Sequence, residues 1–515
     1  MREAGDSAVV IGAGMGGLAA AIRLAALGLA VTVVEAEAAP GGKARAVPTA
    51  AGPAQTGPTV LTWPDLAEEL FALAGQRMDD QLTLTALPEL ARHFWTDGSR
   101  LDLYPSREAN SAAIEAFAGP KEAAAFRRFD QLASDLAEAL TPPILSRPRP
   151  SMLGVLRAVM TRPAIWPALA PGQSLQGLLQ RHFADPRLVQ LFGRYATYVG
   201  GRPHLSPAVL ALIWRVESEG VFAVQGGISA LAAALARMAE ALGVRFLYAT
   251  RARRIRLQDG AVCGVETEGG QFLSCATCVF AGDPEALRQG FLGSAAKAAL
   301  PGTGPKRSLS AWVWAFAAKP QGVDLLHHNL FFTPDPSGEW GPIAKGEMPT
   351  QPTLYLCAQD RLPGRTPPAR ERFEIIMNGP AGQPASAAEE QTCHQRTFPP
   401  LTRFGLTLAP ETPHLLTPQA LARAYPGSGG AIYGGSPEAS LAAFQRPTAR
   451  TRVPGLYLAG GGAHPGAGVP MALLSGRHAV ETIWKDRISG SLRRPGAMPG
   501  GMSTASRTTG RAPSR

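Results

Sequence analysis

Apolar residues and glycines follow one another in a clear order along the first 35 residues. An apolar run from Val9 to Ile11 leads into a glycine-rich turn, an alanine- and leucine-rich stretch follows, and a β-branched run ends at Glu35. A short apolar run bounded by glycine is typical of a buried strand, and a longer alanine-rich run is typical of a helix. The pattern therefore predicts a strand–helix–strand unit at the start of the chain.

Similar patterns return far along the chain. They predict a helix over residues 229–242, a strand over 244–248, a hairpin at Asp259–Gly260 and a buried strand that ends in a turn at Asp283–Pro284. Residues 55–64 predict a turn and a short apolar strand, and residues 455–476 a strand, a glycine-rich turn and a helix of small residues. Strands that alternate with helices indicate an α/β fold.

The composition narrows the class of protein. The chain has 515 residues, enough for two or three domains, with 45% hydrophobic residues, 17% charged residues and a formal net charge of +10. About half of the excess charge comes from the arginines of residues 491–515, a stretch without acidic residues, and we expect residues 488–515 to form a basic disordered tail. The basic balance is therefore no indication of nucleic-acid binding, and we expect no nucleic-acid partner.

The cysteines indicate a reducing compartment, because the five are scattered along the chain. Cys275 and Cys278 form a C-x-x-C pair inside a strand-like run, with no second pair at zinc spacing, so we expect buried thiols and no metal site. No leader precedes the first expected strand, and no apolar run reaches the roughly 18 residues of a membrane span. The expected location is cytoplasmic.

Three glycines and one acid in the first unit have the spacing of a dinucleotide site. Gly12 permits the tight turn, Gly14 lets the backbone approach a pyrophosphate, and Gly17 lets helix and strand pack closely. The helix start offers free N–H groups to the phosphates, and Glu35 can accept hydrogen bonds from ribose hydroxyls. This fingerprint alone does not separate NAD from FAD.

Two further glycine-rich stretches extend this predicted site. In "APGGKARA", Gly42 allows close approach of the backbone, and Lys43 and Arg45 can neutralise phosphate charge. In "GLYLAGGGAHPGAGVPMALLSG", near the end of the chain, a second strand leads through a turn into a second helix. Two such helix starts suit a long cofactor that lies across the sheet, with its adenosine at one end and a flavin at the other.

These stretches together resemble the carotenoid (phytoene-type) desaturases of bacteria and fungi, within the FAD-dependent amine oxidase-like superfamily. The resemblance rests on the N-terminal glycines, on "GGKAR", on "GPTVLT" with Gly57 and Thr59, and above all on the C-terminal signature. It implies non-covalent FAD as the cofactor of these residues. The residues that it places near the flavin are Gly460, Gly461, Gly468, Val469 and Pro470. The chain departs from the family pattern at Gln55, where an acid is usual, and at Ala281–Gly282.

The stretches "TLYLCAQDR", "HHNLFF" and "GGAIYGG" resemble one branch of the family, the 1-hydroxycarotenoid 3,4-desaturases (hydroxyneurosporene or methoxyneurosporene dehydrogenases). This resemblance implies a C-3,4 double bond introduced into acyclic 1-hydroxycarotenoids, hydroxyneurosporene first and hydroxylated lycopene derivatives next, in the spheroidene and spirilloxanthin pathways of photosynthetic bacteria. The alternatives are a phytoene-type multi-step desaturase, an FAD-dependent amine oxidase and a non-catalytic carotenoid carrier. The electron acceptor stays open.

The resemblance implies a Rossmann-like FAD-binding domain with an inserted substrate- and membrane-facing domain. We assign residues 1–100, 220–300 and 420–487 to the first domain, and residues 101–219 and 301–419 to the second. No triad or carboxylate pair marks a catalytic residue, and flavin chemistry does not require one. The tandem histidines His327 and His328 are expected to be structural or to line the substrate site.

Residues 146–171 predict contact with a membrane. The segment is apolar but carries Arg147, Arg149, Arg157 and Arg162, with Trp166 near its end. Cations and an aromatic anchor on an apolar segment suit a lipid surface, and the alternative is a helix pair that covers the core. For a lipophilic carotenoid substrate, we expect peripheral association with the inner or photosynthetic membrane.

Overall fold

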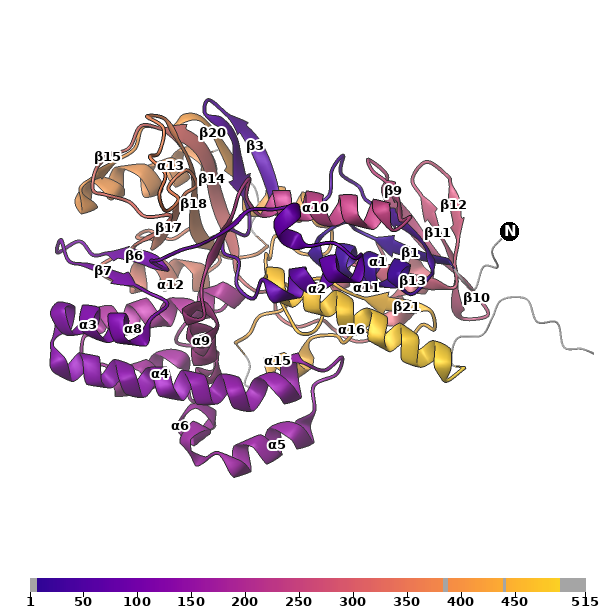
Figure 1. The fold of residues 1–515 in the computed structure, drawn as a ribbon, viewed down its shortest axis with the longest axis horizontal. Helices are drawn as coiled ribbons and strands as arrows, with labels where there is room; N and C mark the ends of the chain where they lie inside the picture. Colours follow the sequence, from indigo (N-terminus) through magenta and orange to yellow (C-terminus); the bar gives the residue numbers. More distant parts are fainter. Residues whose placement is uncertain (1–6, 383–387, 439–440, 491–515) are drawn as a thin grey trace, which may run out of the picture.

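The computed structural model describes residues 7–382, 388–438 and 441–490. One half of the molecule contains a five-stranded sheet in the order β21–β13–β1–β2–β9 (Figure 1). Its strands are β21 (Leu456–Leu458), β13 (Thr277–Phe280), β1 (Ser7–Ile11), β2 (Ala30–Val34) and β9 (Arg245–Leu247). Every neighbouring pair is parallel. The sheet therefore joins segments from the beginning, the middle and the end of the chain, as the sequence pattern predicts.

The side chains of β1 show why this half has three layers. Val10 belongs to a core shared with the helices α1 (Met15–Ala26), α2 (Asp65–Leu73), α10 (Ile228–Ala241) and α16 (Val469–Ile488). Val9 and Ile11 face the antiparallel sheet of β10 (Ala252–Gln258), β11 (Ala261–Thr267) and β12 (Phe272–Ser274). Successive side chains of a strand point to opposite faces, so a strand that is covered on both sides has a continuous apolar sequence.

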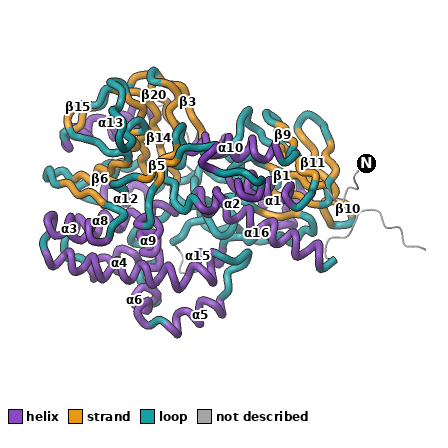
Figure 2. The backbone as a smooth tube through the Cα atoms, in the orientation of Figure 1, coloured by secondary structure: helices purple, strands orange, loops and turns teal. Residues whose placement is uncertain are grey.

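The other half contains a seven-stranded sheet in the order β20–β14–β18–β17–β16–β6–β7. The strands are β20 (Glu411–Leu416), β14 (Ser310–Ala318), β18 (Glu371–Gly379), β17 (Leu354–Ala358), β16 (His328–Phe331), β6 (Ala91–Phe94) and β7 (Arg100–Leu103). Trp312, Trp314 and Phe316 of β14 point into a core with α13 (Glu389–Leu401) on one face. The opposite face looks toward a layer of helices (Figure 2).

The helical layer has an aromatic core around Phe126, Phe129, Phe192 and Trp214. Its helices are α3 (Arg107–Ala118), α4 (Pro120–Leu140), α7 (Leu175–His182), α8 (Pro186–Gly193) and α9 (Leu212–Ser218). The indole of Trp214 donates to Asp130 over 2.8 Å, which satisfies its buried N–H. Two further helices, α5 (Met152–Thr161) and α6 (Trp166–Leu169), lie at the lower rim of this layer (Figure 1).

Shorter elements complete the described chain. Three small antiparallel pairs join β3 (Arg45–Thr49) to β4 (Gly52–Thr56), β5 (Leu84–Ala86) to β8 (Phe222–Val224), and β15 (Gln321–Gly322) to β19 (Leu406–Thr407). The remaining α-helices are α11 (Pro284–Gln289), α12 (Ser337–Ala344), α14 (Pro418–Ala424) and α15 (Ala442–Gln445). In the part of the chain that the structure describes, no helix has the length and hydropathy needed to cross a membrane.

Two expectations from the sequence are wrong. The apolar strand expected within residues 55–64 is a loop with a single bridge from Leu61 to Phe222, because Pro58 and Pro64 remove donors that a strand needs. The domain boundary at residue 100 separates β6 from its partners, whereas β6 pairs with β16 in the seven-stranded sheet. The rest of the domain division stays a prediction, and residues 491–515 of the expected tail lie outside the described residues.

Candidate active site

A single cavity of about 1900 Å³ extends from the parallel sheet to the face of the seven-stranded sheet. Ligand pockets usually measure about 300–1,000 Å³, so this cavity has room for two ligands. All of the predicted site residues line it except Gly17. They are Gly12, Gly14, Glu35, Gly42, Lys43, Arg45, Gly57, Thr59, Gly460, Gly461, Gly468, Val469 and Pro470.

The first glycine turn fits a phosphate-bearing cofactor. Gly12 has a φ of +103°, and a Cβ on Gly17 would lie 1.9 Å from the Gly12 carbonyl oxygen, so Gly17 serves packing. A Cβ on Gly14 would meet only the Gly42 Cα, at 3.8 Å, so the backbone is open there. Gly14 caps α1 without a side-chain hydrogen bond, and the free N–H groups behind it can bind an anion.

Glu35 lies at the end of β2, where the dinucleotide fingerprint requires an acid. Its Oε2 accepts a hydrogen bond from the Ala13 N–H at 2.6 Å, and its Oε1 accepts one from the Glu37 N–H at 2.9 Å. These bonds orient the buried carboxylate toward the cavity wall. A carboxylate has about four acceptor sites, so it keeps capacity for hydroxyl groups. Its contact with a ribose stays a prediction.

Lys43 and Arg446 are partly buried cations that line the cavity, and a third cation, Arg307, lies near both. Lys43 donates to the Ile432 carbonyl at 2.6 Å, Arg446 donates to the Gly461 carbonyl at 2.9 Å, and Arg307 is paired with Asp283. Burial lowers the pKa of Lys43 to about 8 and that of Arg446 to about 10. Three cations face one carboxylate here, so an anionic cofactor group would relieve their repulsion. Sequence patterns gave no local signal for Arg307 or Arg446.

Arg45 differs from Lys43. Its Nε donates to the Gly42 carbonyl at 2.8 Å, and its other nitrogen pairs with Glu37 at 3.2 Å. The guanidinium also lies over the Tyr425 ring. Arg45 therefore stabilises the glycine loop within the protein, and its predicted contact with a phosphate stays a prediction.

The C-terminal turn packs directly on the first turn. A Cβ on Gly16 would lie 2.4 Å from the Gly460 nitrogen, and a Cβ on Gly476 would lie 2.6 Å from the Gly16 carbonyl oxygen. These two glycines let α1 and α16 touch through their backbones, which brings both helix starts to one cavity. Sequence reasoning missed both, because only the spaced glycines of the fingerprint were assigned. The small residues of "SGRHAV" are the signal that could have indicated the contact.

The remainder of the cavity wall is largely apolar. The seven-stranded sheet and the helical layer both contribute to it, with Val313, Leu330, Ile376, Leu416, Leu140, Ile144, Phe183, Ile213 and Phe332. Among its polar side chains, Glu339 is buried and accepts from the Asn378 amide at 3.0 Å. Burial raises the pKa of Glu339 to about 7. The wall therefore carries little charge along its sheet face.

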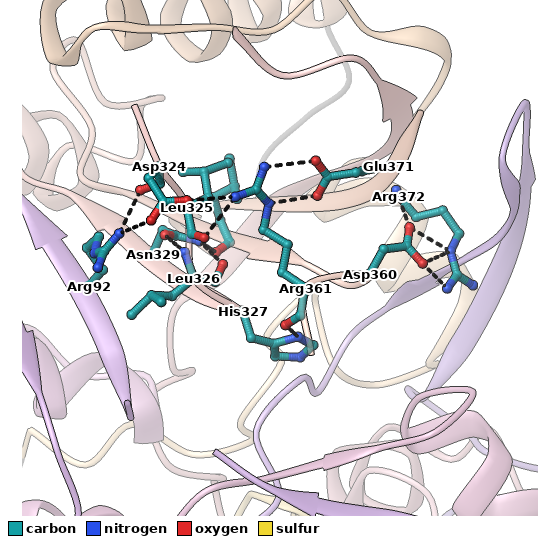
Figure 3. A network of polar contacts seen from close by, with 11 residues as sticks. Arg92, Asp324, Leu325, Leu326, His327, Asn329, Asp360, Arg361, Glu371 and Arg372 are labelled. Carbon is teal, nitrogen blue, oxygen red and sulfur yellow. Dashed lines mark hydrogen bonds and ion pairs between the residues drawn. The ribbon is translucent and has the colours of Figure 1, made fainter. Parts of the chain in front are cut away.

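The tandem histidines are not among the residues that line the cavity; His328 is buried and His327 is partly buried. His327 Nδ1 donates a hydrogen bond to the Arg361 carbonyl at 3.2 Å, and the Arg361 guanidinium pairs with both oxygens of Glu371 at 2.8 and 2.9 Å (Figure 3). One ring nitrogen of each histidine and the Cys357 sulfur lie within 4.8 Å of one another, and His327 Nε2 lies 3.6 Å from that sulfur.

The expectation of buried thiols is confirmed for Cys275 and Cys278, which form no disulfide.

The fold and this site define a flavin-dependent oxidoreductase. The family described as flavin containing amine oxidoreductase matches residues 15–484, and the chain belongs to this family. A putrescine oxidase structure shares the fold, with a TM-score of 0.57 and 15% identity over 93% of this chain and 99% of that one.

Comparison with curated relatives places the chain within the family. It is 60% identical over 492 residues to a hydroxyneurosporene desaturase of Rhodobacter capsulatus, which covers 95% of this chain and 99% of the relative. It is 52% identical over 495 residues to a hydroxyneurosporene desaturase of Cereibacter sphaeroides, over 95% of this chain and all (100%) of the relative. A phytoene dehydrogenase of Streptomyces griseus is 30% identical over 524 residues, 97% of this chain and 98% of that protein. The chain thus belongs with the carotenoid desaturases, nearer to the hydroxyneurosporene branch than to this phytoene enzyme.

Proposed function

We propose that this protein is an FAD-dependent desaturase that introduces a C-3,4 double bond into acyclic 1-hydroxycarotenoids. The observation that carries the proposal is one cavity with two different parts: a cradle of glycine turns and partly buried cations, and a long, mostly apolar wall. The cradle extends from Glu35 to Gly468, which suits the adenosine and flavin ends of FAD. The names of the two hydroxyneurosporene desaturases reported above favour this substrate class.

The apolar wall suits removal of two hydrogens from adjacent carbons of a polyene. A bound flavin supplies the two-electron acceptor for this chemistry. The protein would hold the polyene between the seven-stranded sheet and the helical layer, and would exclude water from the polyene. The mostly apolar side chains of the wall also lower the cost of binding a hydrocarbon, and the charged pair Arg194–Glu217 on it is already paired within the protein.

The test is to incubate the holoenzyme with 1-hydroxyneurosporene, with phytoene and with putrescine. We expect one additional conjugated double bond in the hydroxylated carotenoid, seen as a red shift of its absorption and as a new chromatographic peak. Stepwise desaturation of phytoene without conversion of the hydroxylated substrate would support the multi-step alternative. Peroxide release from the amine would support an amine oxidase, and bound pigment without flavin would support a carrier.

Flavin binding is expected to weaken as the pH rises above about 8. Lys43 is charged below this pKa and neutral above it. An anion bound beside Lys43 raises its pKa, so binding takes up a proton, and affinity falls by up to about tenfold per pH unit above 8. Titration of flavin-free protein with FAD at several pH values measures this slope. The Lys43→Met variant should bind weakly without the slope, and a wild-type affinity independent of pH would contradict the role of Lys43.

We also propose that residues 146–171 dock the enzyme on an anionic membrane. None of the residues of α5 is buried. Its outer side exposes Leu153 at 81% and Met160 at 69%, whereas Val155 and Val159 pack against the helical core. The hydrophobic contact can therefore be made with lipid on one side and with protein on the other.

The docking segment lies beside the substrate cavity. Residues 140–145, which precede it, include cavity-lining side chains such as Leu140 and Leu145. The Leu145 and Arg147 carbonyls lie 2.8 and 3.0 Å from the Nε2 atoms of His478 and His464, which fixes this stretch to the C-terminal turn and α16. A carotenoid dissolved in the bilayer would thus enter next to α5.

A further inference from the structure

The proposed substrate carries one polar group, and its chemistry restricts where that group can bind. This inference rests on the proposed function: the hydroxyl is on C1, and only C2 separates C1 from the C3–C4 bond that reacts. The side chain that binds the hydroxyl must therefore lie where the cofactor cradle meets the apolar wall. A polar group farther along the wall would contact the polyene instead.

Thr59 and Tyr355 both line the cavity at this junction. Thr59 follows Gly57, whose Cβ would lie 2.1 Å from the Lys43 carbonyl oxygen, so this loop rests on the cofactor cradle. Tyr355 belongs to strand β17 of the seven-stranded sheet, where it pairs with Ile376 of β18 and Leu330 of β16. Both of these partners belong to the apolar wall.

A chain of hydrogen bonds links the two residues to His328. The Thr59 hydroxyl lies 2.6 Å from the Tyr355 hydroxyl, and His328 Nδ1 lies 2.7 Å from the same hydroxyl. Burial raises the pKa of Tyr355 and lowers the pKa of His328 well below its usual range, so both groups are neutral. Because Tyr355 has one proton to share, the chain has one direction at a time, and its end at Thr59 offers either a donor or an acceptor to the cavity.

Two other polar groups of the cavity are already engaged. Glu339 and Asn378 bind each other, and Asn378 lies two residues beyond Ile376 on β18, roughly 7 Å farther along the strand. In the helical layer, Arg194 pairs with Glu217 at 3.2 Å and the Tyr198 hydroxyl donates to Glu217 at 3.0 Å. A substrate hydroxyl would have to replace charged hydrogen bonds in this second cluster, which costs more than binding to a neutral chain with a free end.

We propose that the hydrogen-bonded chain Thr59–Tyr355–His328 binds the C1 hydroxyl and determines the preference for hydroxylated over hydrocarbon carotenoids. A hydroxyl both donates and accepts, so it complements either direction of the chain. A methyl ether only accepts, and a hydrocarbon makes no hydrogen bond to Thr59, whose hydroxyl then bonds only to Tyr355. His327, next to His328 in sequence, is held at the Arg361 carbonyl (Figure 3), which fixes the start of β16 behind the chain.

The test is the Thr59→Val variant, which keeps the shape of the side chain and removes the hydroxyl at the cavity end of the chain. Two substrates are compared on the holoenzyme: 1-hydroxyneurosporene and the 1,2-dihydro hydrocarbon of the same length without the hydroxyl. Their dissociation constants are measured by quenching of protein fluorescence, and kcat/KM is measured where product forms. We divide the dissociation constant of the hydrocarbon by that of 1-hydroxyneurosporene. We expect this ratio to fall about threefold to tenfold relative to wild type, which corresponds to the loss of one neutral hydrogen bond.

The matched control is Tyr198→Phe, which removes another hydroxyl from the cavity wall. The substrate ratio should stay at the wild-type value there. A wild-type ratio in Thr59→Val, or a loss confined to Tyr198→Phe, would overturn the proposal. If Thr59→Val does not fold, Tyr355→Phe tests the same chain at the hydroxyl that orients Thr59. Wild-type protein that binds neither carotenoid refutes the proposed function, whereas an unchanged ratio in an active variant refutes this inference alone.

Discussion

A Gly14→Val substitution is expected to yield a folded protein that purifies without flavin. Gly14 has a φ of −75°, which valine can adopt, and a Cβ there would meet only the Gly42 Cα, at 3.8 Å. The protein itself therefore has room for a Cβ at this position. The space that this side chain enters lies at the start of α1, where the phosphates are expected, so the cofactor is excluded. Flavin absorbance of the purified variant and its circular dichroism spectrum measure the two effects.

The matched control is Gly17→Ala, whose new side chain would contact the protein itself and not the expected cofactor space. Its Cβ would lie 1.9 Å from the Gly12 carbonyl oxygen, so this variant must shift backbone and lose stability. Overpacking of this kind typically costs about 1–3 kcal/mol. All melting temperatures are compared with that of the flavin-free wild type, because bound flavin itself stabilises the protein. We expect a lower melting temperature for Gly17→Ala and a nearly unchanged one for Gly14→Val. Stoichiometric flavin in Gly14→Val would show that the phosphates do not approach this turn.

The elements that the sequence predicts well are those whose signals are local. The strand, turn and helix from β1 to β2 follow one another within a short stretch, and each is marked by its own apolar run or glycine. The same holds for α10, for the β10–β11 hairpin at Asp259–Gly260, and for β21 with α16. Their assembly into one sheet followed from the resemblance of the C-terminal signature, because no local rule pairs Cys278 with both Val9 and Leu456.

The features that the sequence could not predict depend on contacts between distant segments. Thr59 and Tyr355 meet only because the loop after β4 crosses the face of the seven-stranded sheet. Arg446 and Lys43 lie near each other on the cavity wall, and neither segment has a pattern that indicates the other. The error at residues 55–64 has the same origin, since an apolar run such as Val60–Leu61 can be buried in a loop when prolines prevent a strand.

The composition of residues 146–171 is compatible with two different roles for this segment. Apolar residues with arginines predict either a membrane contact or a helix pair over the core. The structure shows an apolar helix with one side on the core and the other exposed, so the sequence alone could not decide between the two. Arg162 pairs with Glu138 at 3.0 Å, which leaves Arg147, Arg149 and Arg157 for anionic lipid. Electrostatic attraction is therefore weaker than four arginines would suggest.

The triple variant Leu153→Gln, Leu156→Gln and Met160→Gln is expected to release the enzyme from anionic liposomes. These side chains are exposed on the outer side of α5, and each would lose on the order of 1–2 kcal/mol of burial in the lipid interface. Affinity should fall by more than about tenfold, and the fall should persist at high salt. Replacing Arg147, Arg149 and Arg157 with Gln should remove the electrostatic part of the binding free energy, about 1 kcal/mol for each cation. High salt should remove the same part from the wild type.

Sedimentation with liposomes measures both variants, in the full chain and in a chain that ends at Gly490, because residues 491–515 carry further arginines. The control is Phe272→Gln, which removes an apolar side chain of similar exposure (51%) from β12, far from α5 in Figure 1. Activity on detergent-solubilised carotenoid should survive in every variant, since α5 contributes no side chain to the cavity. If the outer side of α5 contacts protein rather than lipid, the triple variant will bind liposomes as the wild type does. In that case the exposed apolar residues must have another partner.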